Sequence, residues 1–506
     1  RYGAWDHALW GAKLFQDQHS RDIDNIRKGN LLEPQMGWWK PRQADNKARG
    51  HFLDEMEYFA AKNAAANASM SLQGVDMRRQ RITPFTVTRQ LTVLGWYERF
   101  RMANAFNDVA LALFGEQGVD ARLRQAPDGR WMCRRSDAFV RRVTGVGDGS
   151  EKWTVPAREN CAAAIRVEAL YAAGQDAPTM KLLSTDDHLD VKGAEAPQIE
   201  AKLERGQSEH GKTFILTAAN RGDTKRGAWA SYSWTTECPY RNAKDMAAYS
   251  FWIKGDGKGE TLCFQLGCGR EYSSGISDHY VKIDFTGWRR VDLLARERDA
   301  GRMEEFVWPY SNLHNMRFIA SSLDMEHIAQ LSFFLNEVPP GETVTVEVSE
   351  VTATTVCKNE TEQVAVLING TRFPLPFALE SGEYAELEDG VWTRYTEAGF
   401  PCQRTYGAKA ELRAGDNQIE YAGVVKDGAA RAEVAVFALG QPFPATKDQA
   451  ALDKDVRRRL AYEAVEPVFY APTQGFDGNV SVPVRPGEKA YLELRIIGAI
   501  ANPSLA

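Results

Sequence analysis

The residues best placed to do chemistry lie near the start of the sequence, where a carboxylate precedes two adjacent tryptophans. Glu33 stands shortly before Trp38 and Trp39. Sugar rings bind against aromatic faces while carboxylates hold their hydroxyl groups, and most glycosidases place two carboxyl groups across the scissile bond. We therefore take Glu33 as a candidate catalytic residue and Trp38 and Trp39 as candidate substrate-binding residues. A solvated Glu33 and two core tryptophans are the alternatives.

Three more polar residues could line the same site. Glu55 belongs to an acidic cluster at the start of an expected helix, where the positive helix N-terminus also explains acidic residues. We take Glu55 as the second candidate catalytic residue, and Gln73 and His19 as candidate substrate contacts. Gln73 stands where a strand is expected to end. The absence of an acid there argues against ordinary two-carboxylate catalysis within this chain.

The segments that must position these residues alternate between helix and strand. Helical spacing of apolar residues predicts helices over 53–67 and 88–114, and short apolar runs predict extended segments over 30–39 and 69–75. This rhythm is typical of an α/β unit with parallel strands. We expect residues 1–117 to form the C-terminal part of a (β/α)₈ barrel, whose catalytic residues would lie at the carboxyl ends of its strands. A small α-domain is the alternative.

The rest of the chain is expected to be all-β. Short alternating runs are separated by turn residues such as Asp128-Gly129 and Asn369-Gly370. The fold class predicted is therefore multi-domain, with the barrel part followed by three β-sandwich modules. Their expected bounds are 118–206, 207–356 and 357–506.

The middle module carries a resemblance to a known fold. The segments YSFWIKGDGKGETLCFQL, DHYVKIDFTGWRRVDL and LSFFLNEVPPGETVTVEVSEVTA resemble the galactose-binding-like jelly rolls attached to bacterial glycoside hydrolases. The resemblance implies a jelly roll with a possible structural calcium ion, for which Asp256 and Asp284 are the candidate ligands. It does not imply one function, because this fold serves both as a sugar-binding module and as a structural spacer.

The tryptophans of this module divide into two groups. Trp229 and Trp308 fall near expected loops, so we take them as candidate sugar contacts. Trp234 also falls near a loop. Trp252 and Trp288 stand in alternating strand patterns, and we expect them in the core.

Composition excludes several other classes of protein. The net charge of −6 offers no electrostatic reason to bind nucleic acid. No apolar run approaches the roughly 18 residues that a membrane span needs. Seven cysteines without metal-ligand spacing predict buried thiols rather than a disulfide framework, and no metalloprotease, serine-hydrolase or nucleotide-binding motif occurs. We expect no required cofactor and no catalytic metal.

The first section also resembles, more loosely, the end of the barrel in large bacterial carbohydrate-active proteins. That resemblance implies a fragment of a glycoside hydrolase acting on a poly- or oligosaccharide, which holds only part of the active site. Such a protein would be secreted, periplasmic or at the cell surface, with its export signal upstream of Arg1. Two alternatives stay open: a non-catalytic carbohydrate-binding or cell-surface scaffold protein, and a polysaccharide lyase.

Overall fold

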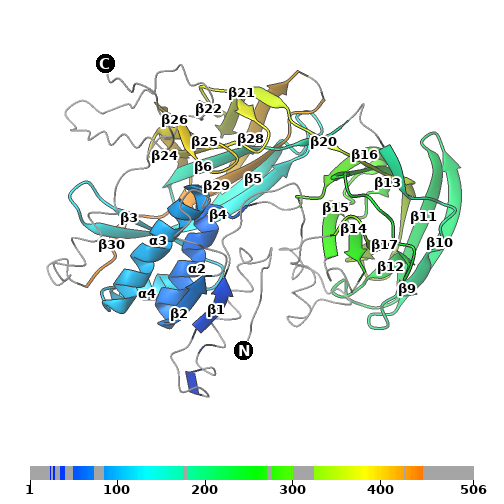
Figure 1. Cartoon of the computed structure of the whole chain (residues 1–506), viewed down its shortest axis with the longest axis horizontal. Coiled ribbons are helices and arrows are strands. Elements are labelled where there is room, and N and C mark those ends of the chain that lie inside the picture. The colour runs from blue at the N-terminus through cyan, green and yellow to red at the C-terminus, as the bar shows by residue number, and fades with distance from the viewer. Residues whose placement is uncertain are drawn as a thin grey trace, which may run out of the picture.

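The computed structural model describes the chain from residue 50 to residue 447 with gaps, and a few residues before that. The described residues are 23, 27–28, 35–39, 50–72, 85–174, 179–269, 276–297, 299, 324–426 and 428–447. They form a helical unit and two β-sandwiches, which Figure 1 shows as separate groups of elements.

The helical unit follows the order expected from the sequence. Its elements are β1 (Gln35–Trp39), α2 (Leu53–Ala66), β2 (Ser69–Leu72), α3 (Phe85–Met102) and α4 (Asp108–Gly115). Strands β1 and β2 pair in parallel across α2, as the alternation of helix and strand predicts. Helix α2 ends at Asn67, whose left-handed backbone (φ 44°) stops the helix.

The described residues do not show a (β/α)₈ barrel; of the expected barrel part they show one pair of parallel strands with a helix between them. The helices bury their apolar sides against one another and against the antiparallel sheet that follows, in one core with Phe59, Phe100, Phe106, Phe114 and Trp131. A helix–strand–helix rhythm predicts parallel strands, but a barrel and a shorter α/β unit share that rhythm. The local pattern therefore could not distinguish between them.

One β-sandwich, which we call the split sandwich, is built from two distant parts of the chain. Its larger sheet has the order β26-β25-β24-β6-β29-β4-β3, with β27 on β6 and β30 on β4; its smaller sheet has the order β22-β21-β28-β5, with β23 on β21. The larger sheet contains β3 (Asp120–Gln125), β4 (Trp131–Val143), β6 (Cys161–Ala169), β24 (Tyr384–Glu388), β25 (Val391–Tyr395), β26 (Pro401–Tyr406), β27 (Ala410–Leu412), β29 (Ala432–Leu439) and β30 (Phe443–Pro444). The smaller sheet contains β5 (Lys152–Ala157), β21 (Glu360–Ile368), β22 (Thr371–Pro374), β23 (Leu379–Glu380) and β28 (Gly415–Val425).

The second sandwich, which we call the inserted sandwich, lies between the two halves of the first. Its outer sheet has the order β10-β11-β18-β13-β19-β8, with β16 on β13; its inner sheet has the order β15-β14-β17-β12-β9. The outer sheet contains β8 (Thr179–Leu183), β10 (Ile199–Ser208), β11 (Gly211–Asn220), β13 (Ala248–Asp256), β16 (Thr286–Leu294), β18 (Thr343–Ser349) and β19 (Val351–Thr354). The inner sheet contains β9 (Asp190–Gly193), β12 (Ala230–Thr235), β14 (Thr261–Cys268), β15 (Ile276–Lys282) and β17 (Ile328–Asn336).

This connectivity differs from the division expected from the sequence. Strand β6 pairs with β24, β27 and β29, so the segments expected as separate modules at 118–206 and 357–506 share one sheet. A short antiparallel ribbon, β7 (Ala172–Ala173) with β20 (Val356–Cys357), joins the entry and exit of the inserted sandwich. The β-sandwich architecture is confirmed, but the described residues hold two sandwiches where the sequence predicts three. Residues 448–506 lie outside the described part.

Buried charges hold the helical unit onto the larger sheet of the split sandwich. The carboxylate of Glu57, 1% exposed, accepts hydrogen bonds from the backbone N–H of Leu123 (2.6 Å), from Arg124 Nη1 (2.9 Å) and from the Tyr97 hydroxyl (3.2 Å). Burial raises the pKa of Tyr97 well above its usual value, and the Glu57 charge adds to the rise, so Tyr97 stays a donor. Glu57 thereby connects α2, α3 and β3.

Ion pairs also join the two sandwiches. Arg431 of the split sandwich reaches both carboxylate oxygens of Glu297 at 3.1 and 2.8 Å, and both side chains are almost fully buried. Arg142 approaches Asp299 at 3.3 Å across the same junction, and Arg296 contacts Glu397 at 2.9 Å. Because such pairs tolerate little change in geometry, they fix how the inserted sandwich sits on the split one.

Replacing Glu57 with glutamine should destabilise the protein strongly. The change removes the charge of a buried carboxylate that accepts hydrogen bonds from Leu123, Tyr97 and Arg124, whose side chain is 33% exposed, and this should cost about 2 kcal/mol. The matched control is Glu98→Gln, which breaks only a partly exposed pair with Arg101 on the same helix and should cost less than about 1 kcal/mol. Urea unfolding measures the free energy of unfolding of both variants. Equal shifts in the two midpoints would contradict the structural role of Glu57.

Candidate functional site

The acidic cluster at the start of α2 serves the fold of the helical unit. Glu55 Oε2 accepts the backbone N–H of Phe52 at 2.6 Å, which is the hydrogen bond of a helix capping box. Asp54 pairs with Arg166, and burial, which would raise the pKa of Asp54, is outweighed by this guanidinium, so the pKa is lowered. Glu57 is buried as described above.

The remaining predicted site residues of the helical unit fall largely outside the described part. Trp38 and Trp39 lie in β1, and the strand register places Trp39 opposite Leu72 at the end of β2. Glu33, Gln73 and His19 lie outside the described residues, as does Trp308. The structure therefore brings the ends of β1 and β2 together but does not describe the side chains predicted to meet there.

A cluster of charged residues fills the space between the helices and the larger sheet. It contains Arg89, Arg122, Arg124 and Arg166 on one side and Asp54, Glu57, Glu386 and Glu388 on the other. Glu388 faces three arginines, which lower its pKa despite burial. The free volume among these side chains is about 30 Å³, enough for a single water molecule. The cluster is therefore an interface between layers and has no room for a sugar.

The inserted sandwich places two predicted sugar contacts in its packed regions. Trp229 is half-buried and packs against the core of the inserted sandwich and against the core of the helical unit. Trp234 also packs against the core of the inserted sandwich, and the guanidinium of Arg241 lies 3.8 Å from its ring. Both rings are half-buried, and what removes them as open sugar contacts is their packing against these cores.

Trp252 and Trp288, which the sequence placed in the core, lie on the outer face of the outer sheet. The core-facing residues of β13 are Tyr249, Phe251 and Ile253, and Trp252 points to the opposite side. Neither Trp252 nor Trp288 belongs to the core of the inserted sandwich or packs against it. The prediction of two core tryptophans was wrong.

These two tryptophans meet a histidine on the sheet surface. The ring of His210, in the turn between β10 and β11, stacks on Trp252 with centroids 3.7 Å apart and planes 7° apart. The same ring lies edge-on to Trp288, with centroids 5.0 Å apart. We call His210, Trp252 and Trp288 the aromatic platform. The backbone N–H of Trp252 donates to Ser349 Oγ at 2.9 Å, which ties the platform to β18.

Charged residues of both signs border the aromatic platform. Lys254 lies 5.9 Å from the Trp288 ring and 3.8 Å from Glu347. Arg290 pairs with Asp292 at 3.4 Å on the neighbouring strand. The surface around the rings is therefore polar and electrically balanced.

The strand pattern itself contained the information that reveals the platform. Ser250, Trp252 and Lys254 alternate with the apolar residues of β13, and Trp288 alternates with Arg290 and Asp292 in β16. Because side chains alternate between the faces of a strand, a tryptophan between polar neighbours at that spacing lies on the polar face.

The two candidate calcium ligands, Asp256 and Asp284, lie in different surroundings. The Asp256 carboxylate accepts the backbone N–H groups of Lys258 (3.1 Å) and Thr345 (2.8 Å), and Asp284 is exposed. Calcium needs six to eight oxygen ligands, and no group of three or more His, Cys, Asp or Glu side chains among the described residues could hold a metal. Asp256 instead shapes the turn after β13.

Glu260, beside Asp256, is a buried acid in the inserted sandwich. It is 0% exposed and interacts with the Asp256 side chain. Burial raises the pKa of Glu260 to about 7, and the Asp256 charge adds to the rise. In the folded chain the protonated carboxyl is therefore favoured at any pH below that value.

This raised pKa predicts a pH-dependent stability. Below the ordinary pKa of 4.5 the acid is protonated in both states and folding carries no ionisation cost. As the pH rises to about 7, only the unfolded chain releases the proton, so stability falls by about 3 kcal/mol. Glu260→Gln should remove this decline, whereas Glu342→Gln at an exposed pair should not. Urea unfolding at pH 5 and pH 8 measures the loss of stability in the intact chain and in both variants. Equal losses in all three would contradict the raised pKa of Glu260.

Comparison with known proteins gives structural likeness alone. No protein-family model and no curated protein matches the sequence. Part of the chain is similar in structure to the family 11 carbohydrate-binding module of the cellulosomal cellulase Lic26A-Cel5E of Clostridium thermocellum. That match has 10% identity, a TM-score of 0.26, and covers 36% of this chain and 96% of the module.

Two other solved structures match at similar levels. An exo-β-agarase matches with 11% identity and a TM-score of 0.22, over 38% of this chain and 25% of the agarase. The module TmCBM61, solved with β-1,4-galactotriose, matches with 11% identity and a TM-score of 0.20, over 34% of this chain and 92% of the module. At these scores the likeness carries no argument about function.

Among the helices that the structure describes, none is both long enough and apolar enough to cross a membrane.

The position of the platform outside the core predicts that its tryptophans contribute less to stability than a core tryptophan does. Trp252→Ala and Trp288→Ala should each lower the free energy of unfolding by about 1 to 2 kcal/mol, because each ring is half-buried and contacts His210 but fills no core. The control is Trp392→Ala in the split sandwich, where the ring is 1% exposed, and its loss should cost about 3 to 5 kcal/mol. Thermal unfolding compares the three. A large loss from Trp252→Ala would show that the platform is a structural core.

Proposed function

We propose that the chain is a non-catalytic glycan-binding protein whose binding surface is the aromatic platform of the inserted sandwich. The observation that carries this proposal is the pair of half-buried tryptophans, Trp252 and Trp288, that lie beside His210 on the outer face of the outer sheet and outside its core. Large aromatic residues left on a surface mark interaction sites more often than isolated aliphatic residues do.

The geometry of the platform suits a sugar chain. The rings come from β13, β16 and the β10–β11 turn, so paired strands hold them in place and little conformational entropy is lost on binding. Aromatic faces contact the C–H faces of sugars, while Lys254, Arg290 and their acidic partners can bond the hydroxyl groups. Since the neighbouring charges are balanced, the glycan that fits is a neutral poly- or oligosaccharide.

The inner sheet offers no comparable open face. Its outward residues Gln265, Asp278 and Ser332 are each at most 1% exposed, and they lie in a hydrogen-bonded row in which Gln265 donates to Asp278 at 2.9 Å. Cys263 and Phe334 on the same face belong to the core of the helical unit. The outer sheet is therefore the face on which a polymer could lie.

Catalysis is the weaker proposal for the described residues. A hydrolase needs two carboxyl groups across a substrate, and the candidate Glu55 is engaged in a helix cap. Glu33 lies outside the described residues. Glycan binding without turnover needs neither residue. Because cell-wall and matrix polysaccharides lie outside the cytoplasm, we propose a secreted, periplasmic or cell-surface location.

Affinity electrophoresis in gels that contain neutral polysaccharides tests the proposal. The panel is mixed-linkage β-glucan, xyloglucan, galactan, xylan and agarose. At least one polymer should retard the intact chain, and Trp252→Ala and Trp288→Ala should each weaken that retardation at least about tenfold, or about 1.4 kcal/mol. The matched control is Tyr406→Ala, which removes an exposed ring of the split sandwich and should change nothing.

Two outcomes would contradict the proposal. Equal retardation of the intact chain and both tryptophan variants would remove the platform as the binding surface. Release of reducing sugar from any of these polymers by the intact chain would support the hydrolase alternative instead.

A further inference from the structure

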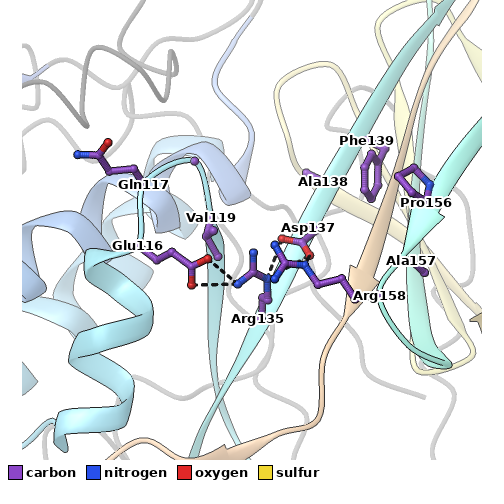
Figure 2. Close-up of a pocket in the computed structure, with 11 residues that line it drawn as sticks. Glu116, Gln117, Val119, Arg135, Asp137, Ala138, Phe139, Pro156, Ala157 and Arg158 are labelled. Carbon is purple, nitrogen blue, oxygen red and sulfur yellow. Dashed lines mark hydrogen bonds and ion pairs between the residues drawn. The ribbon is translucent and has the colours of Figure 1, made fainter. Parts of the chain in front are cut away.

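The split sandwich has a cavity of its own, far along the chain from the aromatic platform. Its volume is about 530 Å³, and it opens where the turn between α4 and β3 meets β4 and β5. Figure 2 shows Arg135 between Glu116 and Asp137, with Phe139 and Pro156 at the other side of the hollow. Small-molecule sites in proteins commonly enclose roughly 300 to 1,000 Å³.

The wall formed by the α4–β3 turn is held rigidly from behind. Lys62 of α2, 1% exposed, donates to the carbonyl oxygens of Phe114 (2.8 Å) and Glu116 (2.5 Å). Tyr58 accepts the backbone N–H of Gly118 at 2.9 Å, and Gly118 has the positive φ of 72° that this turn requires. The wall is therefore preformed, and a ligand would not have to order it.

A chain of alternating charges runs along the cavity. Arg135 Nη1 contacts both oxygens of Glu116 at 2.9 Å, and its Nε lies 3.0 Å from Asp137. Arg158 continues the series, with its Nε 3.8 Å from the other oxygen of Asp137. Two cations and two anions therefore alternate, and their charges balance.

The opposite wall is apolar. Phe139 packs against the core of the split sandwich, which fixes its ring, and Pro156 lies beside it on β5. An occupant therefore meets hydrogen-bonding groups on one side and C–H surface on the other.

From this arrangement we propose that the cavity is a second glycan site, which binds a single neutral sugar unit or the end of a chain. Paired guanidinium and carboxylate groups present donors and acceptors together, as vicinal hydroxyl groups require. An acidic sugar would meet Glu116 and Asp137 and be disfavoured. Phe139 and Pro156 would cover the apolar side of the ring. This site does not depend on the platform, because it belongs to the other sandwich.

The test measures sugar binding at the cavity alone. It uses the full chain with Trp252→Ala and Trp288→Ala as background, so that no signal comes from the platform. Saturation-transfer NMR is recorded with the methyl β-glycosides of glucose, galactose, mannose and xylose at millimolar concentration, and with methyl β-glucuronide. At least one neutral glycoside should give a signal, and the glucuronide should give none.

Cavity variants then locate the binding. Arg158→Ala should lower the neutral-glycoside signal at least about fivefold, and its side chain is 72% exposed, so folding is not at risk. The matched control Arg130→Ala breaks an exposed pair with Asp128 outside the cavity and should leave the signal unchanged. Asp137→Asn should weaken neutral binding and allow the glucuronide to bind, because one repelling anion is gone.

Three results would overturn the proposal. They are no signal from any neutral glycoside, a signal that Arg158→Ala leaves unchanged, and preferential binding of the glucuronide by the background protein. Because the platform is absent throughout, none of these results bears on the function proposed for it.

Discussion

The architecture depends on the pairing of β6 with strands that follow the inserted sandwich. Ala162–Ala169 of β6 faces β29 residue by residue, and β24 takes the other edge of the same strand. Val167, Val434 and Val436 of the two halves share one buried core. Since neither half can bury its apolar face alone, the entry and exit of the inserted sandwich must lie side by side. The β7–β20 ribbon is the result.

Buried charges then set the relative orientation of the elements that the hydrophobic cores bring together. Glu57 aligns α2 and α3 with β3, Lys62 fixes the α4–β3 turn, and Glu297 fixes the inserted sandwich against Arg431. Apolar contacts are tolerant of direction, whereas hydrogen-bonded charges are not. The cavity wall and the orientation of the platform both follow from these few directional contacts.

The sequence predicted the local elements well and their long-range partners poorly. Alternation located β13 and β14, and the Asp128-Gly129 turn located the β3–β4 hairpin. The apolar run of β6 predicted a strand but not which strand would pair with it, because a partner is chosen by the packing of the whole core. The expected barrel, which the described residues do not show, rested on the same kind of local pattern.

For the candidate site too, the local sequence pattern was informative and the long-range contacts could not be predicted. Local pattern already placed Trp252 between Ser250 and Lys254, and the period of two would have put it on the open face. By contrast, the stacking of His210 on Trp252, and the approach of the α4–β3 turn to Arg158, depend on pairings that no local pattern contains.

Oxidative footprinting of tryptophans tests the central claim, that the aromatic platform binds glycan, most directly. Tryptophan oxidation is followed by mass spectrometry with and without a neutral polysaccharide that retards the protein in gels. The polymer should slow the oxidation of Trp252 and Trp288 at least about threefold, since bound sugar covers these rings. The oxidation rate of the buried Trp392 should not change. Oxidation of both platform tryptophans at an unchanged rate, in protein shown to be bound, would contradict the central claim.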